Sequence, residues 1–247
     1  MPFVDFSAFL GHWPFREVPL TDAGSLEAGL REVGVTHAWV SPVAAITQPS
    51  PGPANQEMVE AVGVNTFFSP VPVLNPLRRG EEELAFWARD DRVKAIRLLP
   101  GAHGYSVAEA GSLVSAAASV GIAVIVQMKV RDQRISHPSF ILPEPAVVEI
   151  LDLDRSQPEA TIIVAAANSA QIRELLSSGA RIWCETSHAE SQDTLRHLVA
   201  EVGADRLLCG THAPIVVPQA MAARLHDAAP DAARSVIALG ESLPIRP

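Results

Sequence analysis

Residues 107–129, VAEAGSLVSAAASVGIAVIVQMK, contain the repeating unit from which the fold can be predicted. Residues 107–120 have the character of a helix, Gly121 follows, and residues 123–129 form a short apolar run. Glycine is the usual left-handed residue after a helix because it has no Cβ to clash there. A continuous apolar run is typical of a strand that is buried on both faces of a parallel sheet. The stretch therefore predicts a helix, a tight turn and a buried strand.

The same arrangement recurs along the chain. Glycines at positions 34, 63, 121, 179 and 203 each follow a helix-like stretch and precede an apolar run, with gaps of 29, 58, 58 and 24 residues. A period of about 30 residues is that of the βαβ unit. Eight strands are predicted in this way, at residues 3–6, 37–41, 67–73, 93–99, 123–129, 161–165, 181–185 and 206–209.

Eight alternating units favour the α/β class and a (β/α)8 TIM barrel, with residues 1–247 as a single domain. A doubly wound sheet would more often have a glycine-rich phosphate loop after its first strand, and residues 7–14, SAFLGHWP, contain none. Proline-rich connections at 42–53 and 130–145 follow the second and fifth strands. Both are expected on the active-site face, either as rigid lids or as plain surface loops.

The composition excludes several classes of protein. Hydrophobic residues make up 48% of the chain, charged residues 19%, and the formal net charge is −9. Scattered Lys and Arg argue against a nucleic-acid partner, and no apolar run reaches the roughly 18–20 residues of a membrane span. Two cysteines, Cys184 and Cys209, fit a reducing compartment and look like small core residues. We therefore expect a cytoplasmic enzyme that takes a small-molecule substrate, with a homodimer through the outer helices as one assembly.

Polar residues gather where the predicted strands end, which is the catalytic face of a barrel. Arg97 stands in the apolar strand AIRLL at residues 95–99 and needs an anionic partner, either a substrate carboxylate or an internal Asp5 or Glu185. The candidate catalytic residues are His212, His103, Asp5 and Glu185, and the candidate substrate-binding residues are Arg97, Tyr105, Gln127, Lys129, Arg134 and His137.

The expected roles follow from the chemistry of these side chains. His212 directly follows the last strand and would be a general acid or base with a pKa near neutrality. His103 and Tyr105 would orient the substrate or donate to a developing oxyanion. Arg134 would assist Arg97 with carboxylate oxygens, and Asp5 or Glu185 could polarise a histidine. The same strand-end residues could also line a wet but inactive barrel mouth.

Metal-ligand motifs are absent from the sequence, which contains no His-x-His, no HExxH and no CxxC. We therefore expect no metal and no cofactor. A rearranged divalent site is the alternative, and its ligands would come from His12, His103, His137, Glu185 and His212.

Three segments carry a resemblance to a known family. The stretches VDFSAFLG at 4–11, VKAIRLLP at 93–100 and GADRLLCGTH at 203–212 resemble the first, fourth and eighth strands of the amidohydrolase superfamily. The closer likeness is to its amidohydrolase-related branch, which includes aminocarboxymuconate-semialdehyde decarboxylase. The resemblance covers nearly the whole chain and implies a TIM barrel that carries out hydrolysis or carbon–carbon chemistry.

The departures from that family fall on its metal ligands. Its two first-strand histidines correspond to Ser7 and Phe9, its fifth-strand histidine to Gln127, its sixth-strand histidine to Ala166, and its last-strand aspartate to His212. The resemblance therefore implies the fold without the usual metal-activated water. The segments PGAHGY at 100–105 and DQRISHP at 132–138 are similar to those of a metal-poor group within the branch.

The leading hypothesis is a metal-independent amidohydrolase-like enzyme acting on a small anionic substrate. It would hydrolyse a lactone, amide or ester, or cleave a carbon–carbon bond as a lyase. The first alternative is a non-catalytic barrel that binds a ligand, which a mouth filled by Phe9, Trp13 and the proline-rich loops would favour. The second alternative is a metal-dependent hydrolase with the rearranged ligands named above.

Overall fold

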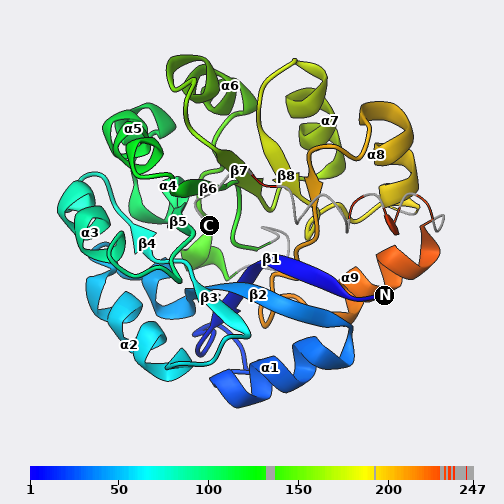
Figure 1. The fold of residues 1–247 in the computed structure, drawn as a ribbon, viewed down its shortest axis with the longest axis horizontal. Helices are drawn as coiled ribbons and strands as arrows, with labels where there is room; N and C mark the ends of the chain where they lie inside the picture. Colours follow the sequence, from blue (N-terminus) through cyan, green and yellow to red (C-terminus); the bar gives the residue numbers. More distant parts are fainter. Residues whose placement is uncertain are drawn as a thin grey trace.

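The strands form a ring and the helices lie outside it, as the computed structural model shows in Figure 1. It describes residues 1–131, 137–191 and 193–228, with residues 231, 233, 234, 236 and 243. The strands are β1 (Phe3–Leu10), β2 (Val35–Pro42), β3 (Phe68–Pro70), β4 (Val73–Leu74), β5 (Ala95–Leu98), β6 (Ala123–Gln127), β7 (Ile162–Ala165), β8 (Trp183–Glu185) and β9 (Leu207–Leu208). The helices are α1 (Ala23–Glu32), α2 (Gly52–Val62), α3 (Gly80–Trp87), α4 (Pro100–His103), α5 (Gly111–Ser119), α6 (Val147–Ser156), α7 (Ser169–Ser177), α8 (Thr194–Val202) and α9 (Gln219–Asp227).

All strand pairs are parallel and fall into two ladders, β1-β2-β3 and β4 to β9 in chain order. The break between them lies in the third predicted strand, where residues 67–73 form two short pieces instead of one. Pro70 and Pro72 cause the break because proline has no N–H to donate to a neighbouring strand. The backbone N–H of Val71 still donates to Val40 at 2.8 Å, and that of Arg97 donates to Pro72 at 2.8 Å. Together, β3 and β4 therefore act as one interrupted strand that connects β2 with β5.

Backbone hydrogen bonds also join the last strand region to the first. Phe6 donates to the carbonyl of Cys209 at 2.9 Å, and His212 donates to that of Ser7 at 2.7 Å. Phe9 donates to Ala213 at 2.7 Å just beyond them. These bonds connect the two ends of the ring, and the predicted (β/α)8 barrel is confirmed.

Element boundaries differ from the prediction where local chemistry decides them. The first strand runs to Leu10 and not to residue 6, and its register with β2 shifts between Asp5 and Ala8. The predicted helix at 107–120 is a 3-10 turn, Val107–Ala110, followed by α5, and Ser106 and Glu109 form a capping box at its start. His103, expected in a turn, is the last residue of the short helix α4.

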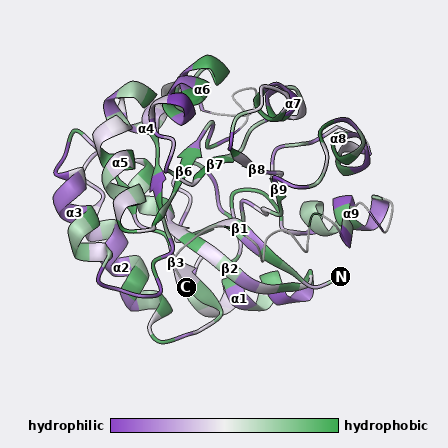
Figure 2. Ribbon diagram, turned by 45° about the horizontal axis from the view of Figure 1, so that its top comes forward, coloured by the Kyte–Doolittle hydropathy of each residue, from purple (hydrophilic) through white to green (hydrophobic). Residues whose placement is uncertain are grey.

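Side chains alternate along the strands, and this alternation divides the barrel interior into layers. An apolar cluster with Trp39, Ala95, Ala123 and Ile125 fills the lower part of the interior. Two residues further along the same strands, the inward positions are polar: Ser41, Arg97 and Gln127. The larger cluster lies between strands and helices, where Figure 2 shows hydrophobic residues on the helix faces toward the barrel. No helix in the described ranges is long and apolar enough to cross a membrane.

Asn55 on α2 completes the backbone pairing of the interrupted third strand. Its side-chain amide donates to the carbonyl of Val73 at 2.8 Å, and its side-chain oxygen accepts from the N–H of Val73 at 2.8 Å. Asn55 is fully buried, so water cannot replace these bonds. One side chain thus satisfies both backbone groups at the start of β4.

We expect Asn55→Leu to lower the free energy of unfolding by about 2–5 kcal/mol, because it leaves two buried backbone groups of Val73 unpaired. Urea denaturation followed by circular dichroism measures this loss. Glu57→Ala, an exposed change on the same helix, is the matched control and should stay within about 0.5 kcal/mol of the wild type. A loss below about 1 kcal/mol for Asn55→Leu would contradict this role.

Candidate active site at the barrel mouth

Arg97 on β5 lies at the centre of the polar layer and is fully buried. Its Nε donates to the hydroxyl of Ser41 at 2.9 Å, and its Nη1 donates to Gln127 Oε1 and, at 3.4 Å, to Ser7 Oγ. Its Nη2 has no hydrogen-bond partner within the described part of the chain. Burial lowers the pKa of Arg97 to about 10, although the negative charges of Glu185 and Asp5 act in the opposite direction. The guanidinium therefore stays charged at neutral pH with donor capacity to spare.

Two buried carboxyl groups lie near Arg97, and each accepts hydrogen bonds from local donors. Asp5 accepts from the N–H of Ser7 at 3.0 Å and from the N–H and hydroxyl of Thr211, the former at 2.9 Å. Glu185 accepts from the N–H of Ala166 and from the N–H and hydroxyl of Ser187, both at 2.8 Å. In the described structure, neither carboxyl group is hydrogen-bonded to the guanidinium. Arg97 therefore interacts with both through space, which is a looser form of the expected internal ion pair.

The electrostatics of these carboxyl groups are set by burial. Exclusion of water raises the pKa of Asp5 and of Glu185, while their hydrogen bonds and the charge of Arg97 oppose the rise. Glu185 fits only because residue 210 is glycine: a Cβ there would lie 1.9 Å from Glu185 Oε2. The backbone beside the last strand is therefore shaped around this carboxyl group.

His212 is fully buried and does not have the near-neutral pKa expected from the sequence. Burial, reinforced by the charge of Arg97, lowers its pKa to about 3. Its Nε2 donates to the carbonyl of Val130 at 2.8 Å, whereas its Nδ1 has no partner in the described ranges. His212 is thus a neutral imidazole whose Nδ1 is a hydrogen-bond acceptor, and it is a weak base.

An apolar cluster closes the mouth above the polar layer. The ring of Phe9 packs against Arg97, whose Cζ lies 4.5 Å from the ring centroid, and against His212 at 5.0 Å between centroids. Trp13, Leu99, Val130 and Ile215 belong to the same buried cluster. We call the cluster that contains Phe9 and Trp13 the mouth plug.

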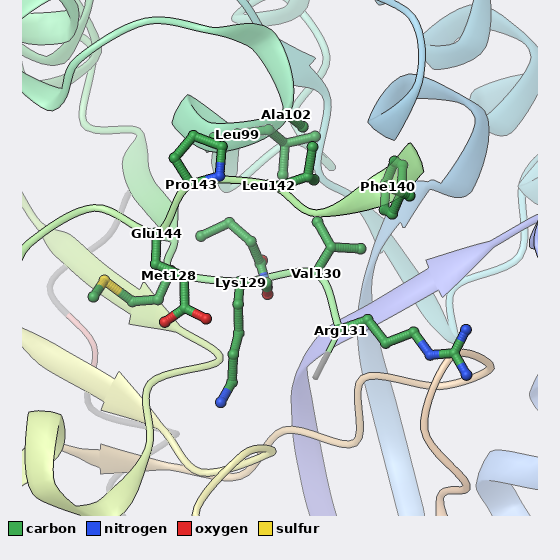
Figure 3. Close-up of a pocket in the computed structure, with 12 residues that line it drawn as sticks. Leu99, Ala102, Met128, Lys129, Val130, Arg131, Phe140, Leu142, Pro143 and Glu144 are labelled. Atoms are coloured by element: carbon green, nitrogen blue, oxygen red, sulfur yellow. The ribbon is translucent and has the colours of Figure 1, made fainter. Parts of the chain in front are cut away.

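The cavity beside the mouth plug is small, about 20 Å³, which is room for little more than one water molecule. It is lined by Leu99, Ala102, Leu142 and Lys129 among others. Figure 3 shows the side chain of Lys129 extending away from Leu99 and Ala102. Lys129, expected to bind substrate, is half-buried and lines this cavity.

His103 and Tyr105 lie beside the mouth plug and not against Arg97. His103 Nε2 donates to the carbonyl of Ala45 at 2.8 Å, and burial lowers the pKa of His103. Its Nδ1 is buried and has no partner among the described residues. The hydroxyl oxygen of Tyr105 accepts from the N–H of Leu99 at 3.0 Å, and burial raises the pKa of Tyr105. Tyr105 therefore holds the backbone of the loop after β5.

The remaining predicted site residues are not brought into this group. His137 is exposed and its ring stacks on Phe15, with centroids 6.5 Å apart. Arg134 and Asp132 fall outside the described residues. His12 lines a surface pocket with Trp13 and Arg16. The histidines that the structure brings together are His212 and His188, with ring centroids 4.7 Å apart.

Sequence reasoning missed four participants. Ser7 and Ser41 bind the guanidinium, and Ser187 and His188 lie two and three residues after Glu185. A period of two from Ser41 or Ser7 could have indicated an inward position, but serine is common in loops and carries little signal alone.

Comparisons with known proteins support the fold. No protein-family description and no curated protein sequence matches the chain. Among solved structures, 2,6-dihydroxybenzoate decarboxylase from Rhizobium matches with a TM-score of 0.74 and 14% identity, over 98% of both chains. Dihydroxybenzoic acid decarboxylase from Polaromonas sp. matches at 0.73 and 14%, over 98% of this chain and 95% of that one.

An amidohydrolase from Mycobacterium avium subsp. paratuberculosis matches with a TM-score of 0.63 and 13% identity, over 92% of this chain and 74% of that one. The first two of these proteins are decarboxylases, and the third is described as an amidohydrolase. The resemblance is thereby confirmed at the level of the fold.

The expectation of no cofactor is contradicted by these neighbours, because the Polaromonas enzyme was solved with bound manganese and the inhibitor 2-nitroresorcinol. The residues of the present chain do not fit such an ion. Within the described ranges no three His, Cys, Asp or Glu side chains are grouped as metal ligands. The alternative ligands His12, His103, His137, Glu185 and His212 are likewise not gathered. In addition, the Arg97 guanidinium places a positive charge inside the mouth, which would repel a divalent cation.

The low pKa of His212 predicts a specific pH dependence of stability. The unfolded chain takes up a proton near the ordinary value of 6.5, and the folded protein does so only near 3. The stabilisation by neutral His212 is therefore complete above pH 6.5 and is lost as the pH falls toward 3. Compared with His212→Gln, the wild type should lose up to about 2 kcal/mol more unfolding free energy between pH 6.5 and 5.

Urea titrations at several pH values measure this difference, and comparison with the variant cancels the effects of Asp5 and Glu185. The control is His226→Gln, because the side chain of His226 is 90% exposed. Parallel stability curves for wild type and His212→Gln across this pH range would show that His212 is not buried as a neutral imidazole.

Proposed function

We propose that this protein is an enzyme that cleaves a carbon–carbon bond in a small hydroxylated carboxylic acid, with release of carbon dioxide. The observation that carries the proposal is the Arg97 guanidinium, fully buried at the carboxyl end of the barrel with Nη2 unpaired in the described structure. The acids named for the structural neighbours, among them 2,6-dihydroxybenzoate, suggest the substrate class. Hydrolysis of a lactone, amide or ester remains a prediction from the sequence.

The unpaired polar atoms around the mouth plug fit such an acid. Arg97 Nη2 and Trp13 Nε1 are donors, which suit the oxygens of a carboxylate. The Nδ1 atoms of His103 and His212 are acceptors, because Nε2 of each ring donates to a backbone carbonyl. Acceptors of this kind suit hydroxyl groups of the substrate. The set therefore favours a ligand that combines a carboxylate with hydroxyls.

The chemistry requires few protein groups. When a carboxylate leaves as carbon dioxide, the electron pair of the broken bond remains on carbon, which then takes a proton. Arg97 would bind and orient the acid, and the mouth plug would exclude water from the reacting carbon. A neighbouring acid must supply the proton, and His212 is poorly suited because its pKa is lowered to about 3.

The filled mouth favours the second candidate function, a barrel that binds a ligand without turnover. Ligand sites usually enclose about 300–1,000 Å³, far more than the cavity of about 20 Å³ beside the mouth plug. Substrate entry would require the rings of Phe9 and Trp13 to move. Binding without carbon dioxide release would therefore support this candidate.

The test is an assay of carbon dioxide release from a panel of mono- and dihydroxybenzoates. Parallel samples contain added Mn²⁺ or EDTA, so that the role of a divalent metal is measured directly. For an acid that is turned over, Arg97→Lys should raise KM about 10–100-fold, because an ammonium cannot form the paired bonds of a guanidinium. The control is Arg31→Lys on α1, whose side chain is exposed and pairs with Glu27.

No carbon dioxide release from any acid in either sample would overturn the proposed lyase function. If the same acids still bind in calorimetric titrations, and Arg97→Lys weakens that binding, the non-catalytic barrel becomes the better description. An unchanged KM in Arg97→Lys would show that Arg97 is not the carboxylate-binding group.

A further inference from the structure

The guanidinium of Arg97 donates only to neutral oxygen atoms in the described structure. Its Nε and Nη1 bind Ser41, Gln127 and Ser7, none of which carries a charge. The ring of Phe9 packs against the guanidinium, with Cζ 4.5 Å from the ring centroid. Nη2 is buried and has no partner in the described part of the chain. Two of the three nitrogens are therefore fixed by the protein, and the third is left for a ligand.

The direction of the bond between Ser41 and Arg97 is set by a proline. The N–H of Val71 donates to the carbonyl of Val40 at 2.8 Å, so in a parallel ladder the carbonyl of Val71 would accept from residue 42. Residue 42 is proline and has no N–H to donate. The hydroxyl of Ser41 donates to the carbonyl of Val71 instead, at 2.8 Å. Because its single hydrogen is used there, Ser41 can only accept from Arg97 Nε.

The orientation of the Gln127 amide is fixed by a second bond of the same side chain. Its Nε2 donates to the carbonyl of Lys129 at 2.7 Å, and its Oε1 accepts from Arg97 Nη1. A guanidinium has only donors, so Oε1 is the one amide atom that it can bind. Gln127 is 3% exposed and is the next inward residue of β6 after Ile125, which lies opposite Arg97 in the strand register. Strand register and burial therefore hold this neutral oxygen against the guanidinium.

The negative charges near Arg97 leave its donors unoccupied. Asp5 and Glu185 act on Arg97 through space, and their hydrogen bonds come from other groups of the loops and strands. The pKa of Arg97, lowered to about 10 by burial, keeps the guanidinium charged at neutral pH. A carboxylate that reaches Nη2 would therefore meet a positive charge that no other anion contacts.

We propose that Gln127 sets the charge specificity of the barrel mouth, because it holds Arg97 through a neutral oxygen and leaves the guanidinium charge to a carboxylate bound at Nη2. Ser41 is a positioning residue that fixes Nε and thereby the direction of Nη2. The proposal rests on the proposed function for the class of ligand, a small carboxylic acid. It goes further by naming the residues that make the site select a carboxylate over a neutral group of the same shape.

The variant Gln127→Glu isolates the charge, because glutamine and glutamate have nearly the same shape. A carboxylate at this position would bind the guanidinium in the paired geometry that arginine prefers. It would cancel much of the positive charge at the mouth and compete with the ligand for the donors of Arg97. A side chain of the protein would thus take the place that the proposal gives to the ligand.

The first experiment measures binding and needs no turnover. Calorimetric titrations compare 2-hydroxybenzoate with 2-hydroxybenzamide, which differ in charge but little in shape. We expect the wild type to bind the acid at least 10-fold more tightly than the amide, since a hydrogen bond to a charged group contributes that much. In Gln127→Glu this ratio should fall to about 1 or below. Gln219→Glu adds the same charge at an exposed position of α9 and should leave the ratio unchanged.

A second pair of variants tests the positioning by Ser41. Ser41→Ala removes the acceptor of Arg97 Nε and should lower the ratio of acid to amide affinity by about 3–10-fold. Ser41→Thr keeps the hydroxyl and should recover most of the ratio. If Gln127→Glu does not fold, as judged by circular dichroism, this pair decides: an unchanged ratio in Ser41→Ala would then overturn the proposal.

The third measurement uses an acid that the wild type turns over. Gln127→Glu should raise KM at least 10-fold and change kcat by a smaller factor, because the lost interaction is made on binding. A merely structural role of Gln127 would lower thermal stability and kcat without changing the ratio of acid to amide affinity.

Equal affinity of the wild type for acid and amide, or no binding of the acid, would overturn the charge specificity. An unchanged ratio in folded Gln127→Glu would show that Gln127 does not set it. Selective binding of the acid without carbon dioxide release from any acid would instead refute the proposed lyase function and leave the roles of Gln127 and Ser41 in place. The two failures are therefore distinguishable.

Discussion

The guanidinium of Arg97 is the group around which the barrel interior is arranged. A permanent charge without water is tolerated only where polar groups and opposite charges surround it. Ser7, Ser41 and Gln127 supply the acceptors, and Asp5 and Glu185 supply the negative charge. The carboxylates need their own donors in turn, which β1 itself and the loops after β7, β8 and β9 provide. One buried cation thereby determines the polarity of a complete layer of the barrel.

The same charge explains why the neighbours' metal chemistry cannot simply be transferred. The Polaromonas decarboxylase was solved with bound manganese, whereas the present chain has the positively charged guanidinium of Arg97 buried at its barrel mouth. His212 responds to that cation and to burial by remaining neutral. Glu185, Ser187 and His188 form a separate buried hydrogen-bonded chain after β8.

Much of the fold could be predicted because it depends on local patterns. The five glycines that follow helices, together with the apolar runs, indicated the number of units, and closure of β9 onto β1 agrees with that number. The sequence showed Pro70 and Pro72 but did not predict that they interrupt the third strand. The interruption depends on how the residues between β3 and β4 pair with the strands on either side. Asn55, which repairs the break from α2, had no sequence signal because its partner Val73 lies 18 residues away.

The sequence predicted which kinds of side chain lie at the candidate site, but only part of how they are arranged. The sequence by itself determined the barrel and placed Arg97 and Gln127 on buried strands, because the apolar runs of the strands are a local property of the chain. Only the tertiary structure decided that His137 lies outside the mouth, that Phe9 packs between Arg97 and His212, and that His188 pairs with Ser187. Those outcomes depend on contacts between separate loops and on burial. Burial also sets the pKa values, so the sequence could supply the groups but not their charge states.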